Sequence, residues 1–209
     1  MPDLQTLALF LAAGLALNLT PGPDMLYVAT RGSAEGRAAG VASALGIAAG
    51  CLVHVAALAL GLSALLEAVP LAYDAVRWAG AAYLVWLGLR ALVRPAPLAL
   101  GGALAPRRLA AVFRQGVVTN VLNPKVALFF LAFLPQFVDP ARGSAARQIV
   151  VLGLLFNVTG TLVNLGVAYL ASGATAWLRA HERRTALAQR LTGLVFVGLG
   201  VRLALGGRR

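Results

Sequence analysis

The sequence has few charged residues and a single cysteine. Charged residues make up 12% of the 209 residues, whereas a soluble domain usually has about 25%. Cys51 has no second cysteine to pair with, which excludes an internal disulfide framework, and we interpret it as a small apolar packing residue. With 60% hydrophobic residues and a mean hydropathy of +0.82, the composition predicts an all-α integral membrane protein.

Several functional signatures are also missing. The sequence contains no metal-ligand constellation, no Walker A loop and no Ser/His/Asp arrangement at a recognisable spacing. We therefore expect that the chain is not an enzyme and that it uses neither a metal nor a cofactor. The net charge of +11 does not indicate nucleic acid, because the basic residues lie in short loops and at helix ends without interleaved aromatic residues.

Long apolar stretches are what the sequence does contain. A transmembrane helix needs about 20 apolar residues to cross the hydrocarbon core of the lipid bilayer. Six stretches meet this length, at residues 4–31, 38–66, 69–93, 110–138, 147–177 and 187–206. They predict a multi-pass protein with six transmembrane helices. With the N-terminus outside, the larger share of the arginines falls inside, so the positive-inside rule predicts N-out and C-out.

The two halves of the sequence resemble each other. Three local matches recur in the same order, at offsets of about 110 residues: residues 31–37 with 142–147, 50–54 with 160–164, and 87–90 with 199–202. We predict two homologous halves, residues 1–95 and 109–209, joined by a cytoplasmic linker at 96–108. Each half then has three spans, and an odd number forces the second half to insert upside down, as an inverted three-helix repeat.

Prolines interrupt the first stretch of each half. Pro21 and Pro23, with Gly22 between them, lack the N–H groups that the carbonyls of Leu17 and Leu19 would need in a continuous helix. Helices 1 and 4 are therefore predicted to be broken, at Pro21 and at Pro124. Broken backbone at membrane depth is tolerated where it is buried in protein or lines a wet cavity, and paired breaks indicate a transporter binding site.

A charged residue follows each break. Asp24 and Lys125 come directly after a proline in the middle of an apolar stretch, where a charge is costly and usually faces the protein interior. They are expected to pair with each other or to bind the charged ends of a substrate. The structural alternatives are a carboxylate that stabilises the start of a helix, for Asp24, and a side chain that snorkels to the membrane interface, for Lys125.

Further polar residues lie at or near the predicted membrane centre. Asn18, Asn120 and Asn123 flank the breaks, where they can satisfy freed backbone groups, bind a substrate, or both. His54 and Asn164 occupy matching places in the second and fifth stretches, and Asn157 adds another amide. His54 is a candidate proton relay, with Asn164 and Asn157 as supporting groups; the structural alternative is a neutral histidine hydrogen-bonded to a neighbouring helix.

Small residues recur at the spacing of closely packed helices. Gly36 and Gly40, and also Gly46 and Gly50, are four residues apart, which serves either packing inside the molecule or a homodimer.

The sequence resembles the LysE/RhtB-type family of amino-acid exporters over nearly its whole length. The most specific motifs are Asn18 to Asp24, Gly116 to Lys125 and Phe129 to Phe137. The resemblance implies a bacterial inner-membrane protein that exports amino acids, with proton antiport. Relatives of this type carry cargo from lysine to threonine, homoserine or leucine, so the family alone does not identify the substrate.

Residues and resemblance together give one hypothesis: secondary active efflux with alternating access. A small neutral amino acid of the threonine, homoserine or leucine type binds between the breaks, its carboxylate near the half-helix starts and Lys125, its ammonium near freed carbonyls and Asp24. The alternative functions are a membrane channel or an exporter of another small metabolite. The predicted binding residues are Asn18, Pro21, Gly22, Pro23, Asp24, Asn120, Asn123, Pro124 and Lys125.

Overall fold

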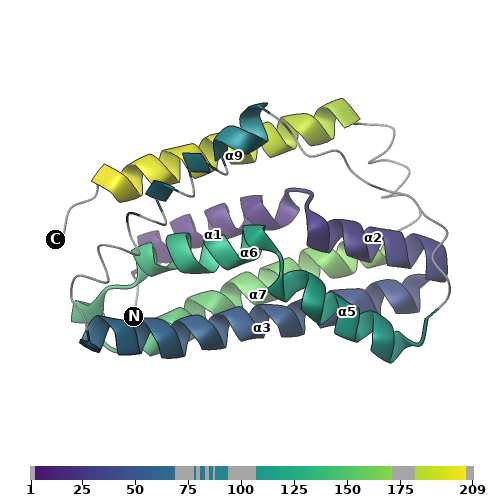
Figure 1. Ribbon diagram of the computed structural model, residues 1–209, viewed down its shortest axis with the longest axis horizontal. Helices are drawn as coiled ribbons and strands as arrows, with labels where there is room; N and C mark the ends of the chain where they lie inside the picture. The colour runs from purple at the N-terminus through teal and green to yellow at the C-terminus, as the bar shows by residue number, and fades with distance from the viewer. Residues whose placement is uncertain are drawn as a thin grey trace.

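In the computed structural model, the parts of the chain that the structure describes are all-helical (Figure 1). They comprise residues 3–68, 78, 81–82, 85–86, 88–93, 107–170 and 182–205. The elements in chain order are α1 (Leu4–Leu19), α2 (Pro23–Glu35), α3 (Arg37–Ala68), α5 (Leu109–Val121), α6 (Pro124–Leu128), a π-helical turn η1 (Phe129–Phe133), two 3-10 turns η2 (Leu134–Phe137) and η3 (Pro140–Arg142), α7 (Ala145–Tyr169) and α9 (Glu182–Leu205).

The described helices account for up to four membrane spans. Arg37–Gly61 of α3 and Ala145–Tyr169 of α7 are each long and apolar enough to cross a bilayer, and two bent helix pairs become spans if each pair is counted as one. These segments correspond to the first, second, fourth and fifth predicted stretches. The third predicted stretch lies mostly outside the described residues, and α9 covers most of the sixth. An inverted six-helix repeat therefore stays a prediction.

Both predicted breaks are present. α1 ends at Leu19 and α2 begins at Pro23, with a bend of 48° between them, while Leu109–Val121 and Pro124–Phe137 meet at 46°. Pro23 and Pro124 each take the first position of the new helix, where the missing N–H has no intrahelical partner to lose. The Asn123 side chain caps the second restart, since its Oδ1 accepts from the Lys125 N–H at 3.0 Å.

The long helix α3 packs against α5, α7 and α2 and lies along the lower edge of the bundle in Figure 1. Glycines allow the α3 and α5 backbones to touch: a Cβ at Gly50 would lie 2.7 Å from the Val117 carbonyl oxygen, and one at Gly116 2.8 Å from that of Ser43. A Cβ at Gly46 would likewise collide with the Phe113 carbonyl. The glycine spacing at 46 and 50 thus serves packing inside the molecule, and a homodimer stays a prediction.

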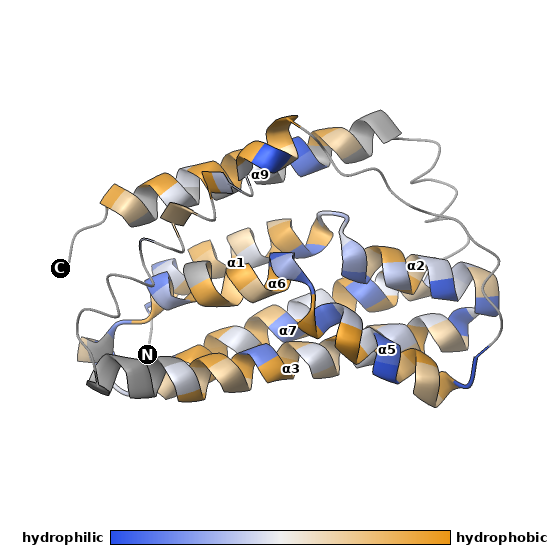
Figure 2. Cartoon of the chain, in the orientation of Figure 1, coloured by the Kyte–Doolittle hydropathy of each residue, from blue (hydrophilic) through white to orange (hydrophobic). Residues whose placement is uncertain are grey.

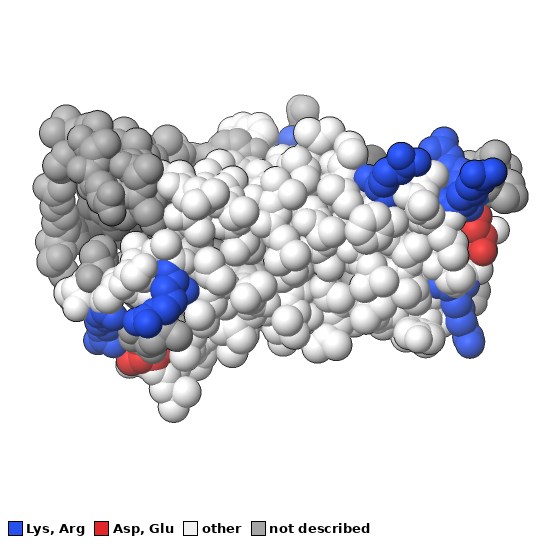
Figure 3. Space-filling model, turned by 90° about the horizontal axis from the view of Figure 1, so that it is seen from below, with Lys and Arg blue, Asp and Glu red and all other residues white. Residues whose placement is uncertain are grey.

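Apolar and charged side chains are segregated along the molecule. Apolar residues cover the middle of the helices in Figure 2, and charged side chains gather at the two ends of the face in Figure 3, with an uncharged band between them. A cluster of stacked phenylalanines fills the core between α1, η1 and α7, with Phe129 and Phe156 ring centroids 4.2 Å apart. The described part of the chain thus has the surface of a protein embedded in a bilayer.

Candidate functional site

The two breaks meet inside the bundle, where Lys125 bridges them. Its Nζ donates to the carbonyl oxygens of Leu17 at 3.1 Å and Thr20 at 2.9 Å. Pro21 has no N–H to donate to the Leu17 carbonyl, which accepts instead from the Thr20 N–H at 3.2 Å and from the Lys125 ammonium of the second break. The negative end of the α1 dipole adds to this stabilisation. Lys125 therefore does not snorkel to an interface.

Gly22 makes room for that lysine. A Cβ at Gly22 would lie 3.1 Å from Lys125 Nζ and 3.3 Å from its Cε. The backbone of Gly22 is extended, with φ −160°, a conformation that any residue can adopt, so glycine is needed here for space. The short connection between α1 and α2, which contains Pro21, positions the carbonyl oxygens of Leu17 and Thr20 that Lys125 contacts.

At the second break, His54 contacts a backbone carbonyl as Lys125 does at the first. Pro124 cannot donate to the Asn120 carbonyl, which accepts from the Asn123 N–H at 2.9 Å and has His54 Nε2 at 3.2 Å. A carbonyl oxygen can only accept, so Nε2 carries the proton of this hydrogen bond. The imidazole also stacks on Phe130, with ring centroids 5.6 Å apart. His54 thus contacts a neighbouring helix, and its role as a proton relay stays a prediction.

Asp24 is buried, with 8% of the residue exposed, in the first turn of α2, where the helix dipole favours a negative charge. Its Oδ2 accepts from Asn120 Nδ2 at 2.8 Å. Three nearby buried atoms have no hydrogen-bond partner among the described residues: Asp24 Oδ1, Asn120 Oδ1 and Asn123 Nδ2. Buried polar atoms are rarely left unpaired, so these three atoms are candidates to bind a ligand or water.

Asp24 and Lys125 are not a direct ion pair. The ion pairs within 4 Å in the described part of the chain do not include one between these two residues. Each charge has its own neutral partners and its own helix end: Asp24 has Asn120 and the start of α2, and Lys125 has two carbonyls at the end of α1. Both charges therefore remain available to a ligand with two charged ends.

A small cavity opens beside Asp24. Its volume is about 30 Å³, enough for roughly two water molecules. Residues from α1, α2, α3, α5, α6 and α7 line it: Asn18, Asp24, Ile47, Cys51, Asn120, Val126, Phe156, Asn157, Gly160, Thr161 and Asn164. An amino acid does not fit into this volume, so the cavity must enlarge before it can hold a substrate.

One wall of the cavity is a polar face of α7. Asn157, Gly160, Thr161 and Asn164 are spaced by three or four residues, which places them on one side of the helix. Asn18 faces this wall and donates from Nδ2 to Thr159 Oγ1 at 3.1 Å. The 3–4 spacing of small and polar residues within an apolar stretch is the sequence signal that would have added Gly160 and Thr161 to the predicted site.

The structure thus sorts the predicted residues into two groups. Asn18, Asp24, Asn120, Asn157 and Asn164 line the cavity. The remaining predicted residues surround the breaks behind it and shape or satisfy the backbone: Pro21, Gly22, Pro23, His54, Asn123, Pro124 and Lys125.

Comparison with known proteins places these motifs in context. The model of the family described as "LysE type translocator" matches residues 15–207. A homoserine/homoserine lactone efflux protein of Salmonella typhimurium is 30% identical, over 93% of this chain and 94% of its own. A leucine efflux protein of Enterobacter sp. is 27% identical over 93% of each chain, and an uncharacterised membrane protein of Vibrio cholerae is 30% identical over 97% of this chain and 98% of its own. No solved structure matches.

Proposed function

The chain belongs to the LysE type translocator family, whose members include amino-acid efflux proteins, and we propose that it exports a small neutral amino acid with a polar side chain. Export is secondary active, driven by proton antiport, and it proceeds by alternating access. The observation that carries this proposal is the meeting of two broken helices around a buried carboxylate, an ammonium group and three unpartnered polar atoms.

The unpartnered atoms match the two ends of an amino acid. An ammonium group has three donors and no acceptor, and two of the unpartnered atoms, Asp24 Oδ1 and Asn120 Oδ1, are acceptors of residues that line the cavity. The third, Asn123 Nδ2, is a donor. We assign the substrate ammonium to Asp24 and Asn120, and the substrate carboxylate to Asn123 and Lys125. Pro21, Gly22, Pro23, Pro124 and Asn18 hold this arrangement in place.

The α7 wall favours a polar substrate side chain. Curated relatives include both homoserine and leucine efflux proteins. Asn157, Thr161 and Asn164 offer amide and hydroxyl groups to a substrate in the enlarged cavity. A leucine side chain would leave these groups without partners, whereas the hydroxyl of homoserine or threonine would bind them, and sites built to bind a hydroxyl reject analogues that lack it.

Proton coupling follows from competition at Asp24. The Asp24 carboxylate holds either the substrate ammonium or a proton, so release of the amino acid outside is followed by protonation from the same side. The proton leaves on the inside before the next substrate binds. We propose His54, which contacts the Asn120 carbonyl, as the proton relay, with Asn157 and Asn164 as supporting polar groups.

The proposed orientation is N-out and C-out in the bacterial inner membrane. The halves at 1–95 and 109–209 would be inverted repeats, and the linker at 96–108 would lie in the cytoplasm, where the positive-inside rule places most arginines. Reporter fusions at residues 100 and 209 should then report opposite sides of the membrane. A report from the same side would contradict both the orientation and the inverted repeat.

Purified protein in liposomes tests the function. We expect homoserine and threonine to move against their gradient when a pH gradient is imposed. Leucine should move at least about tenfold more slowly, because a buried polar group left unpaired costs about 1–3 kcal/mol. Lysine serves as the charged comparison, and a protonophore and protein-free liposomes serve as controls. Flux that does not saturate and ignores the pH gradient would indicate a channel, and flux of none of these compounds would contradict amino-acid export.

A further inference from the structure

Charged side chains form one polar cluster at each end of the molecule (Figure 3). Asp3 precedes α1 and Glu35 is the last residue of α2, so the two clusters lie at opposite ends of the first bent helix pair. Each cluster joins an element of the first half to an element of the second half. Neither belongs to the site around Asp24 and Lys125.

The first cluster, which we name the inner latch, comprises Tyr27, Arg31, Glu35, Arg107 and Gln115. Arg31, with 2% of the residue exposed, pairs through Nη1 with Glu35 and donates from Nη2 to Gln115 Oε1 at 2.9 Å. The Arg107 N–H donates to Glu35 Oε2 at 2.8 Å, and its Nη1 reaches Gln115 Oε1 at 3.4 Å.

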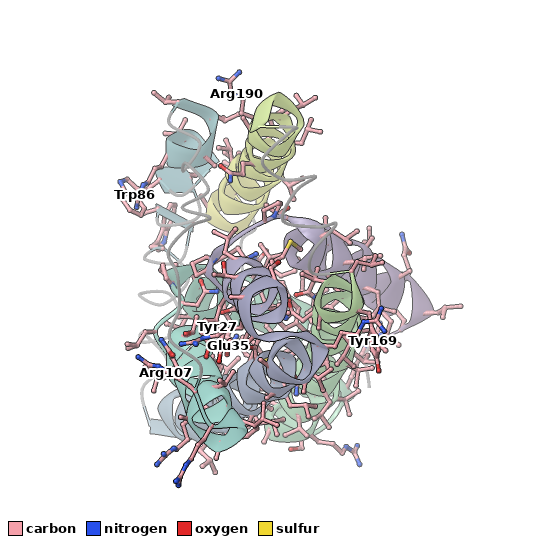
Figure 4. The ribbon with its side chains drawn as sticks, turned by 90° about the vertical axis from the view of Figure 1, so that its right-hand side faces the viewer. Tyr27, Glu35, Trp86, Arg107, Tyr169 and Arg190 are labelled. Atoms are coloured by element: carbon pink, nitrogen blue, oxygen red, sulfur yellow. The ribbon has the colours of Figure 1, made fainter. Side chains whose placement is uncertain are left out.

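Tyr27 completes the inner latch by donating from its hydroxyl to the Val112 carbonyl at 2.8 Å. Figure 4 shows Tyr27, Glu35 and Arg107 at one end of the molecule, beside α5. The latch therefore fastens α2 to α5, at Val112 and Gln115, and to Arg107 just before it.

The second cluster, the outer latch, comprises Asp3, Asp139, Arg142 and Gln148. Arg142 Nη1 lies 2.8 Å from Asp3 Oδ2, and its Nε lies 3.2 Å from Asp139 Oδ2. Buried Gln148 holds the segment by donating to the carbonyls of Asp139 at 2.8 Å and Gly143 at 3.1 Å. Hydrogen bonds from Thr6, with Arg142 as a further cause, hold the pKa of Asp3 below its usual value, so this carboxylate is charged near neutral pH.

The two latches are related by the internal repeat. Arg31 begins the segment 31–37 and Arg142 begins the matching segment 142–147. Arg31 of the first half reaches Gln115 of the second, and Arg142 of the second half reaches Asp3 of the first. Inverted repeats place equivalent residues on opposite sides of the membrane, and the structure holds these two arginines at opposite ends.

We propose that the two arginine-centred latches are the gates of the transporter, which open one at a time, and the contacts of both are formed in this conformation. The inner latch closes the site toward the cytoplasm and the outer latch closes it toward the outside. This inference rests on the proposed transport function, but the experiment below uses no amino acid, so its outcome is independent of whether the substrate is correctly identified.

The latches differ in strength. The side chains of Arg31 and Glu35 are 2% and 6% exposed, whereas those of Arg142 and Asp3 are both 47% exposed. Solvent-exposed ion pairs contribute little, because water screens them and both side chains lose freedom. The inner latch is therefore the stronger gate, and the empty transporter opens more readily toward the outside.

Cys51 provides a native reporter of gate opening. It is the only cysteine of the chain, it lines the cavity, and 2% of the residue is exposed. A small cationic methanethiosulfonate reagent, which does not cross lipid, reaches Cys51 only through an open gate. We would apply it to either side of oriented membranes without amino acid, with Cys51→Ala as the blank.

Glu35→Gln should raise the labelling rate of Cys51 about tenfold from the cytoplasmic side only, as expected for the loss of hydrogen bonds to a charged group. Asp3→Asn should raise it about twofold from the outside only, the size expected for an exposed ion pair. Arg114→Gln and Arg147→Gln change exposed arginines at the same two ends outside the latches, and they should leave both rates unchanged.

Gln115→Glu separates gating from misfolding. Gln115 Oε1 lies near donors of Arg31, Arg107 and Tyr27, so a carboxylate of the same shape should tighten the inner latch. We expect this variant to slow labelling from the cytoplasmic side, which a folding defect cannot do. Unchanged labelling in both Glu35→Gln and Gln115→Glu, or faster labelling of Glu35→Gln from both sides alike, would overturn the proposal.

Discussion

Asp24→Asn should abolish export while leaving the protein folded. The substitution removes the negative charge assigned to the substrate ammonium and the group assigned to the proton. An asparagine oxygen can still accept from Asn120 Nδ2, as the Asp24 side chain does in the structure. Losing two or more charge-assisted contacts, each worth about 1.5–3 kcal/mol, predicts a loss in transport rate of about 100-fold or more.

The measurement is efflux of labelled homoserine from cells matched for the amount of membrane-inserted protein, together with the melting temperature of the purified protein in detergent. The melting temperature should stay close to that of the wild type, because the uncharged amide avoids the cost of a buried carboxylate. Normal efflux by Asp24→Asn would show that the carboxylate has a structural role only, and the proton site would then have to be sought at His54.

Lys125→Met should abolish export and also destabilise the protein. Methionine fills a similar space beside Gly22 but cannot donate to the carbonyls of Leu17 and Thr20. Two charge-assisted hydrogen bonds of about 1.5–3 kcal/mol each are lost, and the end of α1 loses its compensating cation. We therefore expect a lower melting temperature as well as loss of efflux, in contrast to Asp24→Asn.

The double variant Asp24→Asn/Lys125→Met distinguishes two arrangements of the charges. A direct buried ion pair would make each single loss costly and the double loss mild, because no lone charge would remain. In the structure the two charges have separate partners, so the double variant should melt near the temperature of Lys125→Met alone. Recovery to the wild-type melting temperature would show that the two residues are coupled as a pair.

Lys125→Arg is the matched control for charge. Arginine keeps the cation, but its planar guanidinium is bulkier than an ammonium, and the lysine already lies within 3.1 Å of where a Cβ on Gly22 would stand. We expect Lys125→Arg to recover part of the melting temperature that Lys125→Met loses, without restoring wild-type efflux. An arginine variant with a melting temperature as low as that of Lys125→Met would show that shape outweighs charge at this position.

The positions of the helix breaks were determined by the sequence alone. A proline has no N–H and a fixed φ wherever the chain takes it, so Pro21, Pro23 and Pro124 interrupt their helices whatever packs around them. Composition is equally direct, because apolar stretches of about 20 residues with few charges match the thickness of a bilayer. The breaks at both sites, the all-helical structure of the described residues and the family were accordingly predicted correctly.

The partners of the polar groups were decided only by the tertiary structure. The sequence shows that the carbonyls of Leu17 and Asn120 are freed, but not that Lys125 serves the first and His54 the second. Nor does it show that Arg31 and Arg142 each bind the other half of the chain. These contacts join residues separated by 66 to 139 positions, and their choice depends on how whole helices pack through close contacts such as those at Gly50 and Gly116. The local sequence determines that a backbone carbonyl or a buried charge needs a hydrogen-bond partner. The packing of helices that are distant in the sequence determines which residue becomes that partner.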